Sequence, residues 1–81
     1  MTNEEYWNAL HAAVDKLRPY YEIDKVKHNS VYVWTKESDD AIYTENVFDI
    51  TKGEIILYDK RHVIPDDAMP IIREIQAILM E

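Results

Sequence analysis

The stretch VYVWT at residues 31–35 decides the fold of this chain, because all five of its residues have a strong preference for β-strands. Polar residues typical of turns bound it on both sides. Side chains alternate between the two faces of a strand, so Val31 and Val33 share one face. Tyr32 and Trp34 share the other. Both faces are apolar, as expected for a central strand, or for an edge strand whose aromatic face meets a partner.

Two further strands are predicted downstream of this stretch. Residues 42–50 alternate between apolar and polar after a turn at Asp39 and Asp40, which is typical of a strand with one core face and one wetter face. Residues 55–58 form a third strand. Between them lies Gly53, the only glycine, at a hairpin where we expect a residue that accepts a positive φ.

The register of this hairpin has two solutions. A three-residue loop with a bulge at the glycine sets Phe48 opposite Ile56. A two- or four-residue loop sets Phe48 opposite Leu57, and it also places Ile50 opposite Ile55. A slip of one residue would turn every side chain of the strand to the other face. We favour the second register because it gathers apolar residues on one surface.

A helix is predicted at the N-terminal end of the chain. Thr2 and Glu5 have the spacing of a capping box, and Pro19 ends the regular helix near Leu17 or Arg18. Apolar residues recur at helical steps of three and four, at Trp7, Leu10, Val14, Leu17 and Tyr21.

A second helix is predicted at the C-terminal end. Pro70 is tolerated only in a first turn, so Asp67 is the expected capping residue, and the helix runs to the end of the chain. Residues 20–29 have no clean period and are interpreted as a loop that could include a short extended piece.

These elements predict one α+β domain over residues 1–81, with the order αβββα. We expect two layers, in which two helices pack on one face of a three-stranded antiparallel meander. The predicted core consists of Trp7, Leu10, Val14, Leu17, Val31, Val33, Ile42, Phe48, Ile50, Ile55, Leu57, Ile71, Ile72, Ile75, Ile78 and Leu79.

The composition excludes several classes of protein. The chain has 81 residues, nine Lys and Arg against 16 Asp and Glu, and a net charge of −7. It has no cysteine, which excludes disulfide scaffolds and thiol chemistry. The first residues are acidic where a signal peptide is basic, and no apolar run approaches the length of a membrane span. We therefore expect a cytoplasmic protein with no contact to a membrane.

Little in the sequence points to catalysis. His11, His28 and His62 are far apart and lack the spacing of a metal-binding motif. Nucleophile elbows and glycine-rich phosphate loops are missing as well. We therefore predict a protein that is not an enzyme, with no catalytic residue, no cofactor and no metal site.

The element order resembles that of the double-stranded RNA-binding domain. That family binds phosphates with a lysine-rich start to its second helix, whereas residues 65–67 read Pro-Asp-Asp here. Acidic groups at this place repel phosphates, so nucleic acid is not an expected partner.

Aromatic residues are the main surplus, with six Tyr and two Trp. Side chains of this kind beside carboxylates are favoured at protein interfaces, although they also suit an ordinary sheet surface. The predicted interface on the sheet face away from the helices comprises Tyr32, Trp34, Tyr43, Glu45, Val47, Tyr58, Asp39 and Asp40.

We predict a small acidic domain, bacterial or phage-encoded, that acts as a protein-protein interaction module. A first alternative is an acidic nucleic-acid mimic that inhibits a basic nucleic-acid-binding protein, since the chain is similar to anti-CRISPR proteins in size, charge and element order. A second alternative is a small homodimeric structural protein that associates with itself.

Overall fold

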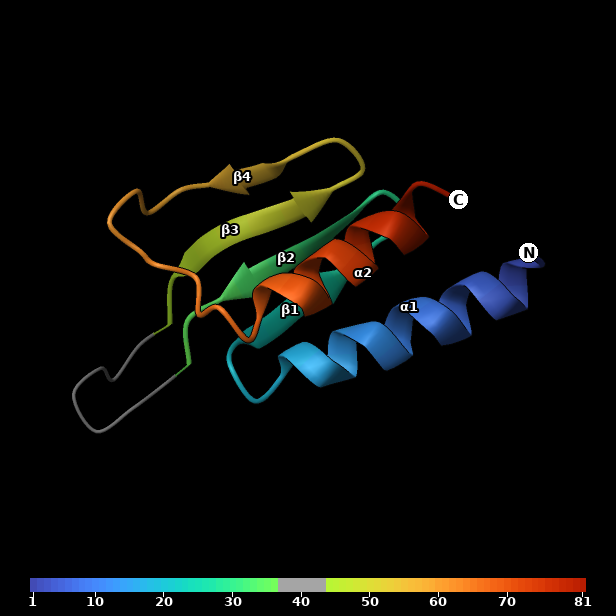
Figure 1. Ribbon diagram of the computed structural model, residues 1–81, viewed down its shortest axis with the longest axis horizontal. Helices are drawn as coiled ribbons and strands as arrows, with labels where there is room; N and C mark the ends of the chain where they lie inside the picture. Colours follow the sequence, from blue (N-terminus) through green and yellow to red (C-terminus); the bar gives the residue numbers. More distant parts are fainter. Residues whose placement is uncertain (37–43) are drawn as a thin grey trace.

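The computed structural model describes residues 1–36 and 44–81, and it has an α+β fold (Figure 1). Two helices lie side by side, next to one antiparallel sheet of four strands. In chain order the elements are α1 (Asn3–Leu17), β1 (Glu22–Val26), β2 (Ser30–Trp34), β3 (Asn46–Thr51), β4 (Ile55–Leu57) and α2 (Met69–Leu79). The α+β class predicted from the sequence is confirmed.

The sheet has one strand more than predicted. Its order is β1-β2-β3-β4, so the meander is confirmed but the count of three strands is wrong. The additional strand, β1, occupies part of the segment interpreted as a loop. Its register shifts between Ile23 and Lys25, which breaks the alternation and lets Ile23 and Val26 both pack against the core. With β1 on one side and β3 on the other, β2 is a central strand.

The hairpin of β3 and β4 has the register that the apolar residues favour. Phe48 pairs with Leu57, and Ile50 pairs with Ile55. The expected positive φ at the glycine is wrong, because no glycine in this chain has one. Instead, Thr51 closes the turn: its hydroxyl donates to the carbonyl of Glu54 at 2.8 Å and accepts from the amide of Glu54 at 3.2 Å.

The capping residue predicted for the first helix is correct, whereas the one predicted for the second helix is wrong. The capping box of α1 is confirmed, with the Glu5 amide donating to the Thr2 hydroxyl at 3.1 Å. In α2 the capping position is Ala68 and has no side-chain cap, so the expectation of Asp67 is wrong. Ala68 is buried, and its amide donates to the carbonyl of Pro65 at 2.9 Å. It therefore continues a turn that begins before α2. Pro70 lies in the first turn, as expected.

The core is one buried cluster that joins both helices to β2 and β3. Most of the predicted core belongs to it, but five predicted residues are only partly buried around it: Trp7, Ile55, Leu57, Ile71 and Ile78. Ile42 lies outside the described residues. The cluster also contains residues that were not part of the predicted core: Tyr6, Ala13, Tyr21, Val47 and Ala68.

Candidate aromatic and acidic site on the sheet

The face of the sheet away from the buried valines carries the candidate site. Val31 and Val33 are fully buried, so the side chains that alternate with them in β2 lie on the opposite face. The register places Tyr32 opposite Asp49 and Trp34 opposite Asn46 in β3. We call the surface formed by Tyr32, Trp34, Asn46, Asp49, Ile56 and Tyr58 the outer face.

Val47 does not lie on the outer face, contrary to its prediction from alternation. The register between β2 and β3 shifts between Val33 and Trp34, which leaves Val47 without a partner in β2. An extra residue of this kind turns the following side chains, and Val47 is 1 % exposed within the core cluster. Its carbonyl accepts a hydrogen bond from the amide of Tyr58 at 2.8 Å.

The other predicted interface residues divide into three groups. Tyr32, Trp34 and Tyr58 come together on the outer face as expected. Glu45 is exposed just before β3, where its amide donates to the Thr35 hydroxyl at 3.0 Å. It does not line either of the two hollows of this surface that are described below. The remaining three, Tyr43, Asp39 and Asp40, lie outside the described residues.

Three residues of the outer face were not part of the predicted interface, namely Asn46, Asp49 and Ile56, and Asp49 is the most buried of them. It is only 7 % exposed. One carboxylate oxygen accepts from the Tyr58 hydroxyl at 2.7 Å, and the other accepts from the Asn46 side-chain amide at 3.3 Å. The same amide donates to the carbonyl of Val33 at 3.0 Å, which fixes its position. The only signal in the sequence was a charged residue between two core residues of one strand.

A hollow of about 300 Å³ opens beside this carboxylate. Tyr32 and Tyr58 both line this hollow, and their pKa values are shifted in opposite directions. Donation to Asp49 is the main cause that raises the pKa of Tyr58 above its ordinary value. The pKa of Tyr32 is lowered, first by hydrogen bonding with Ser30 and then by Lys27, whose Nζ lies 5.2 Å from the centre of the ring. The residues lining the hollow are Asp24, Tyr32, Trp34, Asn46, Asp49 and Tyr58.

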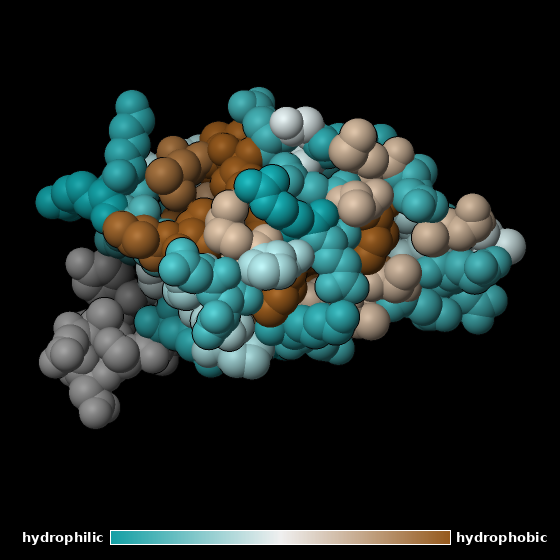
Figure 2. All heavy atoms as spheres, in the orientation of Figure 1, coloured by the Kyte–Doolittle hydropathy of each residue, from teal (hydrophilic) through white to brown (hydrophobic). Residues whose placement is uncertain are grey.

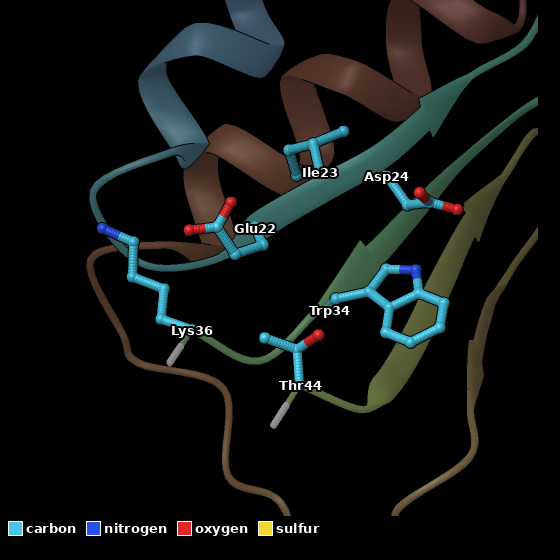
Figure 3. A pocket seen from close by; sticks show the side chains of 6 residues that line it. All are labelled: Glu22, Ile23, Asp24, Trp34, Lys36 and Thr44. Atoms are coloured by element: carbon cyan, nitrogen blue, oxygen red, sulfur yellow. The ribbon is translucent and has the colours of Figure 1, made fainter. Parts of the chain in front are cut away.

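A second hollow, of about 610 Å³, adjoins the first and shares Asp24 and Trp34 with it. In Figure 3 the nitrogen of the indole ring lies on the side of Asp24, while Lys36 lies on the opposite side of this hollow. The indole nitrogen of Trp34 is buried and has no hydrogen-bond partner in the part of the chain that the structure describes. The Trp34 side chain therefore lies between the two hollows, and its N–H is covered but not hydrogen-bonded by described residues.

Apolar side chains also remain exposed near the edge strand β4. Ile56 and Tyr58 on the outer face are 37 % and 54 % exposed, and Val63 beyond the strand is more exposed still. Figure 2 shows, from the side of α2, apolar residues gathered over β4 and the segment that follows it.

The histidines lie at two separate places. His11 and His28 pack around the ring of Trp7, whereas His62 bonds through Nε2 to the hydroxyl of Tyr21 at 2.5 Å. In residues 1–36 and 44–81, no three His, Asp or Glu side chains are grouped so as to hold a metal ion.

No protein-family model, curated protein sequence or solved structure matches the chain. Within the part of the chain that the structure describes, neither helix combines the length and apolar character needed to cross a membrane. The function is therefore inferred from the geometry of the outer face.

Proposed function

We propose that this chain is a protein-binding module, not an enzyme, and that it binds its partner through the outer face. The observation that carries the proposal is the exposure of Ile56 and Tyr58 beside the nearly buried carboxylate of Asp49. Apolar and aromatic groups around a few fixed polar groups are typical of interaction sites, where aromatic residues supply much of the binding energy.

The arrangement of the core supports the availability of this face. Buried residues of β2 and β3 share one cluster with buried residues of both helices. We infer that both helices cover the same face of the sheet, so that two layers are formed and the outer face is left to solvent. A partner can then reach the outer face without displacing a helix.

A pair of matched variants tests the use of this face. Ile56→Glu and Met80→Glu each add one negative charge at an exposed apolar position, but Met80 lies beyond the end of α2, away from the outer face. Immobilised wild-type protein and both variants are incubated with a lysate of the source cells. A protein that wild type and Met80→Glu retain, and Ile56→Glu loses, is then purified and its affinity measured by calorimetry.

We expect binding of the purified partner to weaken at least about tenfold in Ile56→Glu, because a charge placed in a desolvated contact costs more than about 1.4 kcal/mol. Equal affinity of the two variants for the partner would overturn the proposal.

Sedimentation equilibrium over a hundredfold range of concentration tests the two alternatives, self-association and mimicry of a nucleic acid. A dimer that persists in salt and dissociates in Ile56→Glu would show that a second copy occupies the outer face. A monomer whose affinity for a basic partner falls steeply with salt would favour the acidic mimic, because long-range charge would then dominate.

A further inference from the structure

The carboxylate of Asp49 has neutral hydrogen-bond donors but no cation. Within residues 1–36 and 44–81 the ion pairs involve Glu74, Asp15 and Asp59, and none involves Asp49. Residues 37–43 contain no Lys, Arg or His, so they offer no cation either. A buried carboxylate is costly unless a positive charge compensates it. A positive group from outside the chain would relieve this cost.

The aromatic rings around Asp49 are suited to the same kind of group. Trp34 and Tyr58 line the hollow together with this carboxylate, and the face of an aromatic ring attracts a cation electrostatically. The chain already uses this attraction nearby, where Lys27 lies over the ring of Tyr32.

The ring of Tyr32 already has cations beside it. Lys25 pairs with Tyr32 across β1 and β2, and Lys27 lies over the same ring. Asp49 pairs with Tyr32 from β3, and its carboxylate lines the hollow together with Trp34 and Tyr58. An incoming cation is therefore expected at the other two rings, between Trp34 and Tyr58.

The indole nitrogen of Trp34 gives a second, independent indication. It is buried and has no hydrogen-bond acceptor among residues 1–36 and 44–81, although a buried indole N–H ordinarily finds a partner. A free amine or metal ion would not accept this hydrogen bond, whereas a peptide carbonyl would. Atoms of the chain cover this N–H, so a peptide carbonyl would accept from it once binding uncovers it. The indole nitrogen therefore favours a ligand in which the positive charge is carried on a peptide.

We propose that the hollow between Trp34 and Tyr58 binds the guanidinium group of an arginine in a basic segment of a partner protein. Each oxygen of Asp49 accepts one hydrogen bond from the chain. A carboxylate oxygen can accept a second, which suits the two parallel donors of a guanidinium. A planar guanidinium also stacks on an indole or phenol ring better than an ammonium does. The inference rests on the proposed function, since it specifies the chemistry of the partner on the same face.

The test uses Nα-acetyl-L-arginine methylamide as the probe, with the neutral citrulline analogue and the lysine analogue as comparisons. The two tryptophans give two indole N–H signals in a ¹H–¹⁵N NMR spectrum of the protein. Trp34 reports on the hollow, and Trp7, on α1, is the internal control. We expect the arginine probe to shift the Trp34 signal saturably and to leave the Trp7 signal in place. The citrulline and lysine analogues should bind at least about threefold more weakly.

Asp49→Asn keeps an oxygen that accepts from Tyr58 but removes the negative charge, and it should weaken binding of the arginine probe about tenfold. Asp24→Asn is a second variant at an exposed position, with an expected weakening of about threefold, and it serves if Asp49→Asn fails to fold. Equal shifts with arginine and citrulline would overturn the proposal. Equal binding of the lysine analogue, or unchanged affinity in the folded variants, would also overturn it.

These outcomes are separable from those of the proposed function. If the probe does not bind but Ile56→Glu still loses the partner, the face binds protein by another chemistry. If the probe binds but Ile56→Glu and Met80→Glu retain the partner equally, the arginine site is present and the module binds that partner elsewhere.

Discussion

The two faces of β3 carry side chains of opposite kind. Phe48 is fully buried in the core cluster, and Asp49, the next residue, is almost as buried on the opposite face. Phe48 loses only apolar surface to its neighbours, which stabilises the fold. Asp49 forms no ion pair with the described residues. Burial therefore stabilises the fold at Phe48, whereas at the next residue it covers a carboxylate for which we propose a role in binding.

The largest effect on the free energy of unfolding is expected for a substitution on the core face of β3. Phe48→Ala should lower the free energy of unfolding by about 3–5 kcal/mol, because it removes a large side chain from a closed core and leaves a cavity. Urea denaturation measures the change. Ile56→Ala, on the outer face, is the control and should cost less than about 1 kcal/mol. Similar losses in both variants would contradict the assignment of the two faces.

The next largest effect tests whether Val47 lies in the core or on the outer face. Val47→Thr should cost about 1–3 kcal/mol, because it places a hydroxyl in the core without a change of shape. If alternation held and the residue lay on the outer face, the same change would cost close to nothing. The matched control is Val63→Thr at an exposed valine, compared by urea midpoint.

A smaller effect is expected at the carboxylate itself. Asp49→Asn should change the free energy of unfolding by no more than about 1 kcal/mol, because loss of an uncompensated charge offsets the weaker hydrogen bonds from Tyr58 and Asn46. A loss above about 2 kcal/mol in urea would mean that Asp49 serves the fold instead of a ligand.

The smallest effect concerns the tyrosines in alkaline solution. Burial raises the pKa of Tyr6 and Tyr21, the hydrogen bond to Asp49 raises the pKa of Tyr58, and Tyr32 alone is lowered. A raised pKa adds stability that is complete below the ordinary value of 10.0 and is lost as pH rises through the folded value. The lowered pKa of Tyr32 acts in the opposite direction, because it adds stability that is fully present above pH 10.0.

With three groups raised and one lowered, the urea midpoint should fall as pH rises above 10.0. Absorbance of tyrosinate should show one early-titrating group that disappears in Tyr32→Phe and persists in Tyr58→Phe. Early titration that persists in Tyr32→Phe would contradict the opposite pKa shifts of Tyr32 and Tyr58.

Local signals in the sequence predicted most of the elements. The capping box at Thr2 and the helical steps after it placed α1, and Pro70 limited where α2 could begin. Apolar residues around the hairpin selected its register. The strand β1 escaped prediction because Ile23 and Val26 are three residues apart, a spacing that breaks the alternation of a regular strand.

The sequence by itself determined the fold class, the meander, the hairpin register and the aromatic character of the outer face. These depend on the alternation of side chains within single strands and on the periods of single helices, which are local properties of the chain. Only the tertiary structure decided that Val47 enters the core and that Asp49 is buried without a cation beside Trp34 and Tyr58. The position of Val47 arises from a register shift between β2 and β3. Both features depend on contacts between strands, which the pattern within a single strand does not determine.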